Sequence, residues 1–140
     1  MKTPLCSDPG TRWEYGTNID FVGKAVEAVS GKRLDAYLRD HLLALQEIQD
    51  ALAAGAFDRA ADVAEQRLGM SSLIAHGAHE VAKYMPKGMQ DAGTAMHRSA
   101  SRFSVAALDA AVTDDVKPAL GALAEVTANC VACHAAYRLQ

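Results

Sequence analysis

Apolar side chains recur every three or four residues in several long stretches of this chain, and this spacing constrains the fold more than any other feature. In residues 34–54 the intervals between successive large apolar side chains are 4, 4, 3, 3 and 4. That spacing is typical of the inward face of a helix in a bundle. The stripe consists of Leu34, Leu38, Leu42, Leu45, Ile48 and Leu52.

Four further helices are predicted, at about residues 18–30, 57–85, 87–112 and 116–137. Gly69 and Gly77 mark a bend in the stretch 57–85, and Pro86 separates it from the next helix. The expected inward stripes of the last two helices are Met89, Ala92, Met96, Ala100, Phe103, Ala107 and Ala110, and then Val116, Leu120, Leu123, Thr127, Cys130, His134 and Tyr137.

Alanine, the best helix former, supplies 28 of the 140 residues. Residues 1–45 hold 4 of these alanines and residues 46–140 hold 24. Together with the short predicted loops, this composition indicates an all-α fold, an antiparallel four-helix bundle with an extra N-terminal loop and short helix. We expect two parts, an N-terminal arm at 1–33 and the bundle at 34–140.

The charge balance excludes several partners. The net charge is −3 and neither half of the chain is basic, so we expect no nucleic-acid binding. No apolar run approaches the roughly 20 residues that a membrane span needs. The first ten residues have no apolar core of a secretory signal, so the chain as written is expected to be cytoplasmic.

Two cysteines lie three residues apart and a histidine follows them, in Cys130-Val131-Ala132-Cys133-His134. Cys-x-x-Cys-His is the attachment motif of c-type haem. Its two thiols form thioethers with the haem vinyl groups, and the histidine reaches the iron as an axial ligand. On a helix, Cys130 and His134 are one turn apart, so both are expected on the inward face.

Other interpretations of the motif remain open. The cysteines can be a thioredoxin-like redox pair, although the sequence shows no βαβ pattern around them, or inert core residues beside a chance histidine. A structural zinc site needs about four ligands, and the chain has no second cysteine pair. His76 and His79, at i and i+3, can share a metal, but a solvated polar face is the default interpretation.

Residues 39–140 resemble the cytochrome c prime superfamily, whose members are periplasmic four-helix bundles. The matching segments are 39–45, 67–73, 96–103 and, most specifically, 130–138, which runs from Cys130 through Tyr137 and Arg138. The resemblance implies one haem c, held by Cys130 and Cys133, with His134 as the iron ligand. It also implies electron transfer or binding of NO or CO, a periplasmic location and the capacity to form a homodimer. Arg138 is expected near the haem propionates.

The distal side departs from that family. Six-coordinate members place a methionine on the first bundle helix, whereas this chain has no methionine between Met1 and Met70. The distal candidates are Leu34, Tyr37, Leu38 and His41. Leucine cannot ligate iron, so we predict a five-coordinate, high-spin haem, with His41 or Tyr37 as the rival sixth ligand. His97 and Arg98 are expected to be exposed on the flank of helix 87–112.

Residues 9–43 resemble a different family, the serine β-lactamase-like esterases, around Tyr15 and the following helices. In that family the tyrosine assists a serine nucleophile in a Ser-x-x-Lys motif. None of the seven serines here is followed by Lys at the third position, and Asn18 lies three residues after Tyr15 rather than two. We therefore expect no enzymatic activity, and a chimera joined near residue 40. The alternative to a cytochrome is a helical bundle without haem, or a chimeric product, with no biochemical activity.

Overall fold

A computed structural model describes the backbone of residues 34–75 and 85–136, together with Ala28, Gly77, His79, Ala82 and Lys83; the side chains of residues 34–38 are outside the described set. This part of the chain contains α-helices, one π-helical turn and no β-strand, which confirms the all-α fold class. The elements are α2 (Leu34–Ala53), α3 (Phe57–Val63), the π-helical turn η1 (Ala64–Leu68), α4 (Ser72–Ala75), α6 (Lys87–Thr113) and α7 (Lys117–Ala136).

Three of the predicted helices match closely, since α2, α6 and α7 agree with 34–54, 87–112 and 116–137 to within a residue at each end. The stretch 57–85 is not one helix: it begins as α3, passes through η1 and breaks at Gly69 before α4. The described residues therefore hold five α-helices rather than four. Apart from Ala28, the predicted arm at 1–33 and its helix at about 18–30 lie outside them.

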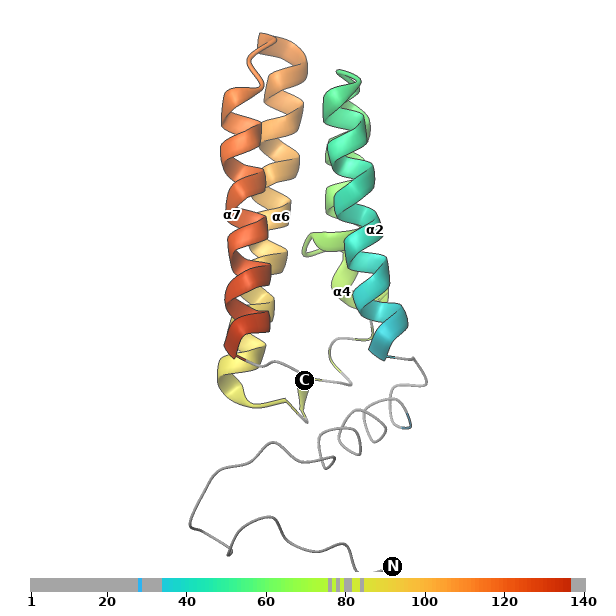
Figure 1. Ribbon diagram of the computed structural model, residues 1–140, viewed down its shortest axis with the longest axis vertical. Helices are drawn as coiled ribbons and strands as arrows, with labels where there is room; N and C mark the ends of the chain where they lie inside the picture. The colour runs from blue at the N-terminus through green and yellow to red at the C-terminus, as the bar shows by residue number, and fades with distance from the viewer. Residues whose placement is uncertain are drawn as a thin grey trace, which may run out of the picture.

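The long helices form two antiparallel hairpins (Figure 1). The loop at 114–116 joins α6 to α7, and the loop at 54–56 joins α2 to α3. The hairpins meet where α3 and η1 pack against α6, while α7 packs chiefly against α6. The C-terminal end of α7 and the N-terminal ends of α2 and α6 consequently lie at the same end of the helical layer.

Alanines form most of the contact surface between these helices. Phe103 of α6 is fully buried, and Ile48, Leu68 and Val126 are also within the core. Small side chains allow two helix axes to approach closely. In this core the helix backbones therefore lie close together around a few large side chains. The buried alanines are Ala44, Ala51, Ala60, Ala61, Ala64, Ala100, Ala107, Ala110 and Ala119.

This alanine core corrects two of the predicted stripes. Leu42 of α2 is 68% exposed and Leu120 of α7 is 49% exposed, although both were expected to face inward. The buried faces contain Ala44 and Ala119 instead. The reason is steric, because at close helix spacing only small side chains fit along the contact line, and the leucines lie on its edges. The predicted stripe of α6 is confirmed from Met96 to Ala110.

The sequence predicts a bend near Gly69, and the structure has the π-helical turn η1 just before this residue. The amide of Gly69 donates to the Ala64 carbonyl at 2.7 Å, an i→i−5 bond that adds one residue to the helical turn. Gly69 is buried, and a Cβ built on it would lie 2.8 Å from Cα of Glu65. Only glycine therefore fits where the chain leaves η1.

Local backbone and side-chain groups mark both ends of α6 and the start of α7. Pro86 is the N-cap of α6, and its carbonyl accepts from the amides of Met89 and Gln90. Asp114 ends α6 in the left-handed conformation, at φ 58°. Asp115 Oδ1 accepts from the Lys117 amide at 3.0 Å and begins α7.

Among the described helices, α7 is the one long and apolar enough to cross a membrane, with a mean hydropathy of 1.2 over its best 18-residue window. Length and composition alone are weak indications, because core helices of soluble proteins satisfy the same criteria. The described residues thus show no clear membrane span.

We predict that Gly69→Ala lowers the free energy of unfolding by about 1–3 kcal/mol, because its Cβ would overlap the backbone of Glu65. Chemical denaturation measures the change. Gly121→Ala in α7 is the matched control: no atom lies within 4 Å of its added Cβ, so it should raise stability by up to about 1 kcal/mol. Equal effects at both positions would contradict a steric role for Gly69.

Candidate functional site

The cysteine motif lies in the last two turns of α7, a helix that continues to Ala136. Cys130 and Cys133 are both free thiols and both half-buried, and Cys130 packs against the alanine core. Burial, reinforced by the neighbouring Cys133 sulfur, raises the pKa of the Cys130 thiol. Burial also raises the pKa of the Cys133 thiol. Both groups are therefore protonated thiols at neutral pH.

His134 is exposed, which corrects the expectation that it shares the inward face with Cys130. The buried face of α7 passes through Ala119, Leu123 and Val126, and its next positions are Cys130 and Cys133. His134 lies on the flank of that face. Tyr137, the last residue of the predicted stripe, and Arg138, the predicted propionate partner, lie outside the described residues.

An ion pair between Arg102 of α6 and Glu125 of α7 defines the register of that hairpin. Cys130 lies five residues beyond Glu125, and His97 lies five residues before Arg102. Because the helices are antiparallel, His97 is at the level of Cys130 along the helix axes. The cysteine motif and the buried part of α6 around His97 thus belong to one layer of the structure.

His97 is 4% exposed, which contradicts the expectation that it lies on the outer flank of α6. Its Nδ1–H donates to the Leu68 carbonyl at 2.7 Å, and Ser72 Oγ lies 3.5 Å from the same nitrogen. The break after η1 turns the Leu68 carbonyl toward α6 and thereby supplies this acceptor. No spacing pattern in the sequence predicts this contact, because Leu68 and His97 are 29 positions apart.

The ring of His41 on α2 meets the ring of His97 edge to face, with centroids 6.1 Å apart and an interplanar angle of 87°. Of the four distal candidates, His41 is the one whose side chain is described; those of Leu34, Tyr37 and Leu38 are not. The structure therefore brings one predicted distal residue, His41, beside a histidine that sequence analysis had placed at the surface.

Burial lowers the pKa of His97, although its hydrogen bonds to the backbone at Leu68 and Gly69 act in the opposite direction. The neutral imidazole is therefore the folded form at neutral pH. With Nδ1 carrying the proton for Leu68, the unprotonated nitrogen of that form is Nε2.

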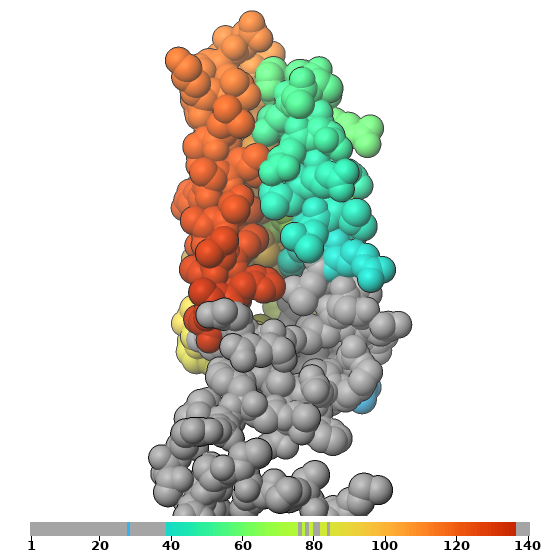
Figure 2. Space-filling model, in the orientation of Figure 1, coloured from blue at the N-terminus to red at the C-terminus, as the bar shows by residue number. Residues whose placement is uncertain are grey.

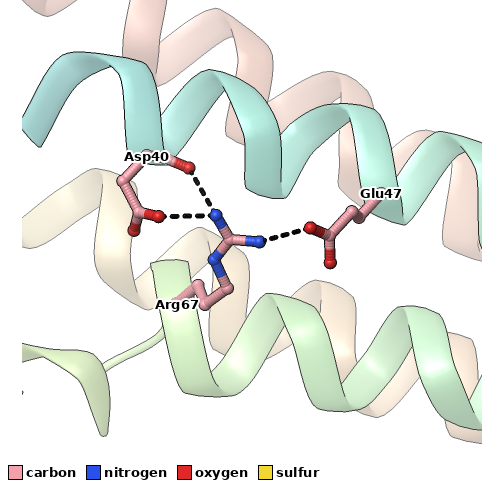
Figure 3. Close-up of polar contacts among 3 residues, drawn as sticks. All are labelled: Asp40, Glu47 and Arg67. Carbon is pink, nitrogen blue, oxygen red and sulfur yellow. Dashed lines mark hydrogen bonds and ion pairs between the residues drawn. The ribbon is translucent and has the colours of Figure 1, made fainter. Parts of the chain in front are cut away.

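Hydrogen bonds from the Arg67 side chain fix the position of η1 against α2. Arg67 Nη1 donates to Glu47 Oε1 at 2.8 Å, and Nη2 donates to Asp40 Oδ1 at 2.6 Å and to the Asp40 carbonyl at 3.1 Å (Figure 3). The hydrogen bond to Asp40 is the main reason that the pKa of Arg67 is raised. One guanidinium thus ties η1 to two turns of α2.

Glu65 ties the same turn to the loop that follows it. Its carboxylate accepts from the Ser71 amide at 3.1 Å and from the Ser71 hydroxyl. Partial burial acts to raise the pKa of Glu65, but hydrogen bonds from Ser101 and Ser71 outweigh it and the pKa is lowered. Ser101 Oγ in turn accepts from the Met70 amide at 2.9 Å. The loop that presents the Leu68 carbonyl is thereby held against α6.

The described residues contain no cluster of three or more His, Cys, Asp or Glu side chains able to hold a metal ion. His79 is exposed, and its predicted partner His76 lies outside the described set. A hollow of about 510 Å³ lies at the opposite end of the helices, between the 54–56 loop and the end of α6, and includes none of the predicted site residues.

The donor set fits covalent haem attachment. Two protonated thiols on one face of a helix are the groups that form thioethers, and an exposed imidazole next to them is free to ligate iron. On the face drawn in Figure 2, α7 (orange to red) and α2 (teal) form neighbouring columns, and the surface between them is hollowed toward the C-terminal end of α7. The residues present are therefore those that a haem c requires.

Comparison with known proteins links part of the chain to enzymes. A 50-residue segment, 36% of the chain, is 40% identical to the acyltransferase mokF of Monascus pilosus and to monacolin J acid methylbutanoyltransferase of Aspergillus terreus. A 42-residue segment is 33% identical to ML-236A carboxylate methylbutanoyltransferase mlcH of Penicillium citrinum. The chain spans 12% of the length of the first two and 10% of the third. No family model and no solved structure matches it.

The expectation that the protein has no enzymatic activity is contradicted by these relatives, whose names are those of acyltransferases. The expectation rested on a missing Ser-x-x-Lys motif. A segment that spans 12% of an enzyme need not include the enzyme's nucleophile, so the missing motif could not support that conclusion.

We predict that stability falls as the pH is lowered below about 6.5, the ordinary pKa of the histidine side chain. The unfolded chain binds a proton at that pH while buried His97 resists it, so acid favours unfolding until the lowered folded pKa is passed. Urea denaturation across pH 5–8 measures the slope.

His97→Asn keeps an amide N–H for the Leu68 carbonyl but removes the titrating ring, so it should flatten this pH dependence. His79→Asn, at an exposed position, is the matched control and should leave it unchanged. The same slope in wild type and His97→Asn would contradict a role for His97.

Proposed function

We propose that the protein is a c-type cytochrome in which Cys130 and Cys133 hold one haem c through thioethers and His134 ligates its iron. The observation that supports this most directly is the state of the motif on α7, where two half-buried free thiols adjoin an exposed histidine. When bound, the haem supplies a one-electron redox centre and a site for small gases such as NO or CO. Electron transfer or gas binding is therefore the proposed activity.

The packing of α7 supports an apolar group along this helix. Only 17% of the most apolar 18-residue window of α7 is buried. Val131, within the motif, is 62% exposed. A helix of this composition is stabilised when more of its surface is covered. A haem is a large, flat apolar group, and attachment at Cys130 and Cys133 would place it against this part of α7.

The finer architecture belongs to the same proposal. We take α2, the α3–η1 segment, α6 and α7 as the four members of an antiparallel bundle within residues 34–140. The two hairpins and the packing of α3 and η1 on α6 support this arrangement. A periplasmic location follows from the proposal, since c-type haem is attached outside the cytoplasm.

The environment opposite the motif bears on the sixth ligand. His97 uses Nδ1 for the Leu68 carbonyl, and His41 packs edge to face against it. Their mutual packing supports a structural role for both rings and, with it, a five-coordinate iron. His41 remains the rival sixth ligand.

Acyl transfer is the second candidate function, favoured by the segment shared with three acyltransferases. In this alternative the chain represents a small part of such an enzyme, and its substrates would be an acyl donor and an acceptor. Two of the three relatives are named as methylbutanoyltransferases, so a methylbutanoyl thioester is the donor to use as a probe.

The cytochrome proposal predicts a haem band on a denaturing gel after export of the full chain to a periplasm that attaches c-type haem. Cys130→Ser/Cys133→Ser should abolish this band because no thioether can form, while Cys6→Ser, the matched control, should retain it. His134→Ala should retain the covalent band and alter the absorption spectrum. Absence of covalent haem from the exported wild type would refute the proposal.

For the second candidate, the full chain is incubated with a methylbutanoyl thioester and examined by intact-mass spectrometry. Acyl transfer predicts a mass increase of one acyl group that survives Cys6→Ser/Cys130→Ser/Cys133→Ser, since thiols react with thioesters without catalysis and this variant has none. An unchanged mass in this triple variant would contradict acyl transfer through a covalent intermediate on this chain.

A further inference from the structure

Two histidines from different helices lie together beside η1. The ring centroids of His41, on α2, and His97, on α6, are 6.1 Å apart and the ring planes are at 87°. A metal ion held by one nitrogen of each ring at about 2.0–2.1 Å sets the two centroids roughly 5–6.5 Å apart, depending on the angle at the metal. The observed separation lies near the upper end of that range, where the nitrogen–metal–nitrogen angle is wide and close to linear.

His97 has the tautomer and the backbone support that are typical of a metal ligand. Its Nδ1–H donates to the Leu68 carbonyl at 2.7 Å, so Nε2 carries the lone pair. A histidine that ligates a metal almost always donates its other ring N–H to a carbonyl or a carboxylate, which fixes the ring and makes the ligating nitrogen more basic. Burial lowers the pKa of His97, so the neutral imidazole that a metal requires is present at neutral pH.

His41 supplies the second nitrogen and a route of entry. Its Nε2 atom is buried, while the residue as a whole is half-buried, so its ring connects solvent to the buried ring of His97. The hydrogen bond to Leu68 holds the ring of His97, so any rotation that aims a nitrogen at the ion is made by His41. Rotation about the Cβ–Cγ bond of His41 leaves its centroid nearly in place and therefore preserves the spacing of the two rings.

The surroundings of the two rings select the kind of ion. Among the described residues no third histidine, cysteine or carboxylate joins the pair. The carboxylates around η1 already bind other groups, since Asp40 and Glu47 accept from Arg67 and Glu65 accepts from Ser71. A divalent ion such as Zn²⁺ requires about four ligands and would leave two positive charges in a largely enclosed place. Cu⁺ binds imidazole, is satisfied by two nearly linear ligands and carries one charge.

We propose that His41 and His97 form a two-histidine site for Cu⁺, in which each imidazole gives one nitrogen lone pair to the ion. Nδ1 of His97 keeps its hydrogen bond to Leu68, so Nε2 is the ligand atom of this residue. The bound ion adds a direct link between α2 and α6, whose contact otherwise runs chiefly through α3 and η1. The site uses no residue of the cysteine motif and does not rest on the proposed haem.

Anaerobic titration of the full chain with Cu⁺, against the coloured chelator bathocuproine disulfonate, tests this proposal. Thiolates bind Cu⁺ strongly, so the titration uses the Cys6→Ser/Cys130→Ser/Cys133→Ser chain, which has no thiol. We expect one Cu⁺ per chain. Added His41→Asn or His97→Asn should each weaken binding at least about 100-fold, because losing a ligand costs more than the 10- to 100-fold that losing a ligand's hydrogen-bond partner costs.

His79→Asn, at an exposed position, is the matched control and should leave the affinity for Cu⁺ unchanged. Far-UV circular dichroism confirms that each variant is folded. X-ray absorption at the copper edge, on the thiol-free chain with both histidines, should show two nitrogen ligands with imidazole scattering and no sulfur.

Three results overturn the proposal. The first is a thiol-free chain that binds Cu⁺ no more tightly than its His41→Asn and His97→Asn variants. The second is a sulfur ligand on the bound copper, because a methionine then holds the ion. The third is Zn²⁺ that binds as tightly as Cu⁺ and displaces it, because the site then does not select a monovalent ion. Since the thiol-free chain cannot carry covalent haem, none of these results depends on the cytochrome proposal.

Discussion

Close approach of helices through alanine is the constraint on which the rest of the structure depends. Ala44, Ala60 and Ala107 are completely buried, and Phe103 is the largest side chain enclosed with them. Small contact residues bring backbones together but contribute little apolar area of their own. Leu42 of α2 and Leu120 of α7 are therefore left on the edges, where another group can cover them. An apolar α7 that is mostly uncovered is a direct consequence of this packing.

The π-helical turn η1 connects this packing to the candidate site. Arg67 binds it to α2, and Glu65 holds the loop behind it. Gly69 has no side chain, so the chain can leave η1 close to the backbone of Glu65. The Leu68 carbonyl thereby reaches His97 on α6. One local irregularity thus keeps a histidine buried and neutral in the layer of the structure that contains Cys130.

The cysteine motif and the acyltransferase relatives point to different chemistries. The proposal of haem attachment rests on Cys130, Cys133 and His134 alone and does not depend on the rest of the chain. The relatives share 50 residues with this chain and span eight times that length or more themselves, so most of each relative lies outside the shared segment.

The sequence by itself determined the helices α2, α6 and α7 and the spacing of the motif, since each of these depends on neighbours within a few positions. It placed Ile48 of α2 and Leu123 of α7 on the buried faces but was wrong for Leu42 and Leu120, because large side chains dominate the periodic pattern while close helix packing admits only alanine along the contact line. Only the tertiary structure decided that His97 is buried, that His134 is exposed and that the stretch 57–85 breaks at η1. Those outcomes depend on contacts between residues such as Leu68 and His97, 29 positions apart, which no local pattern records.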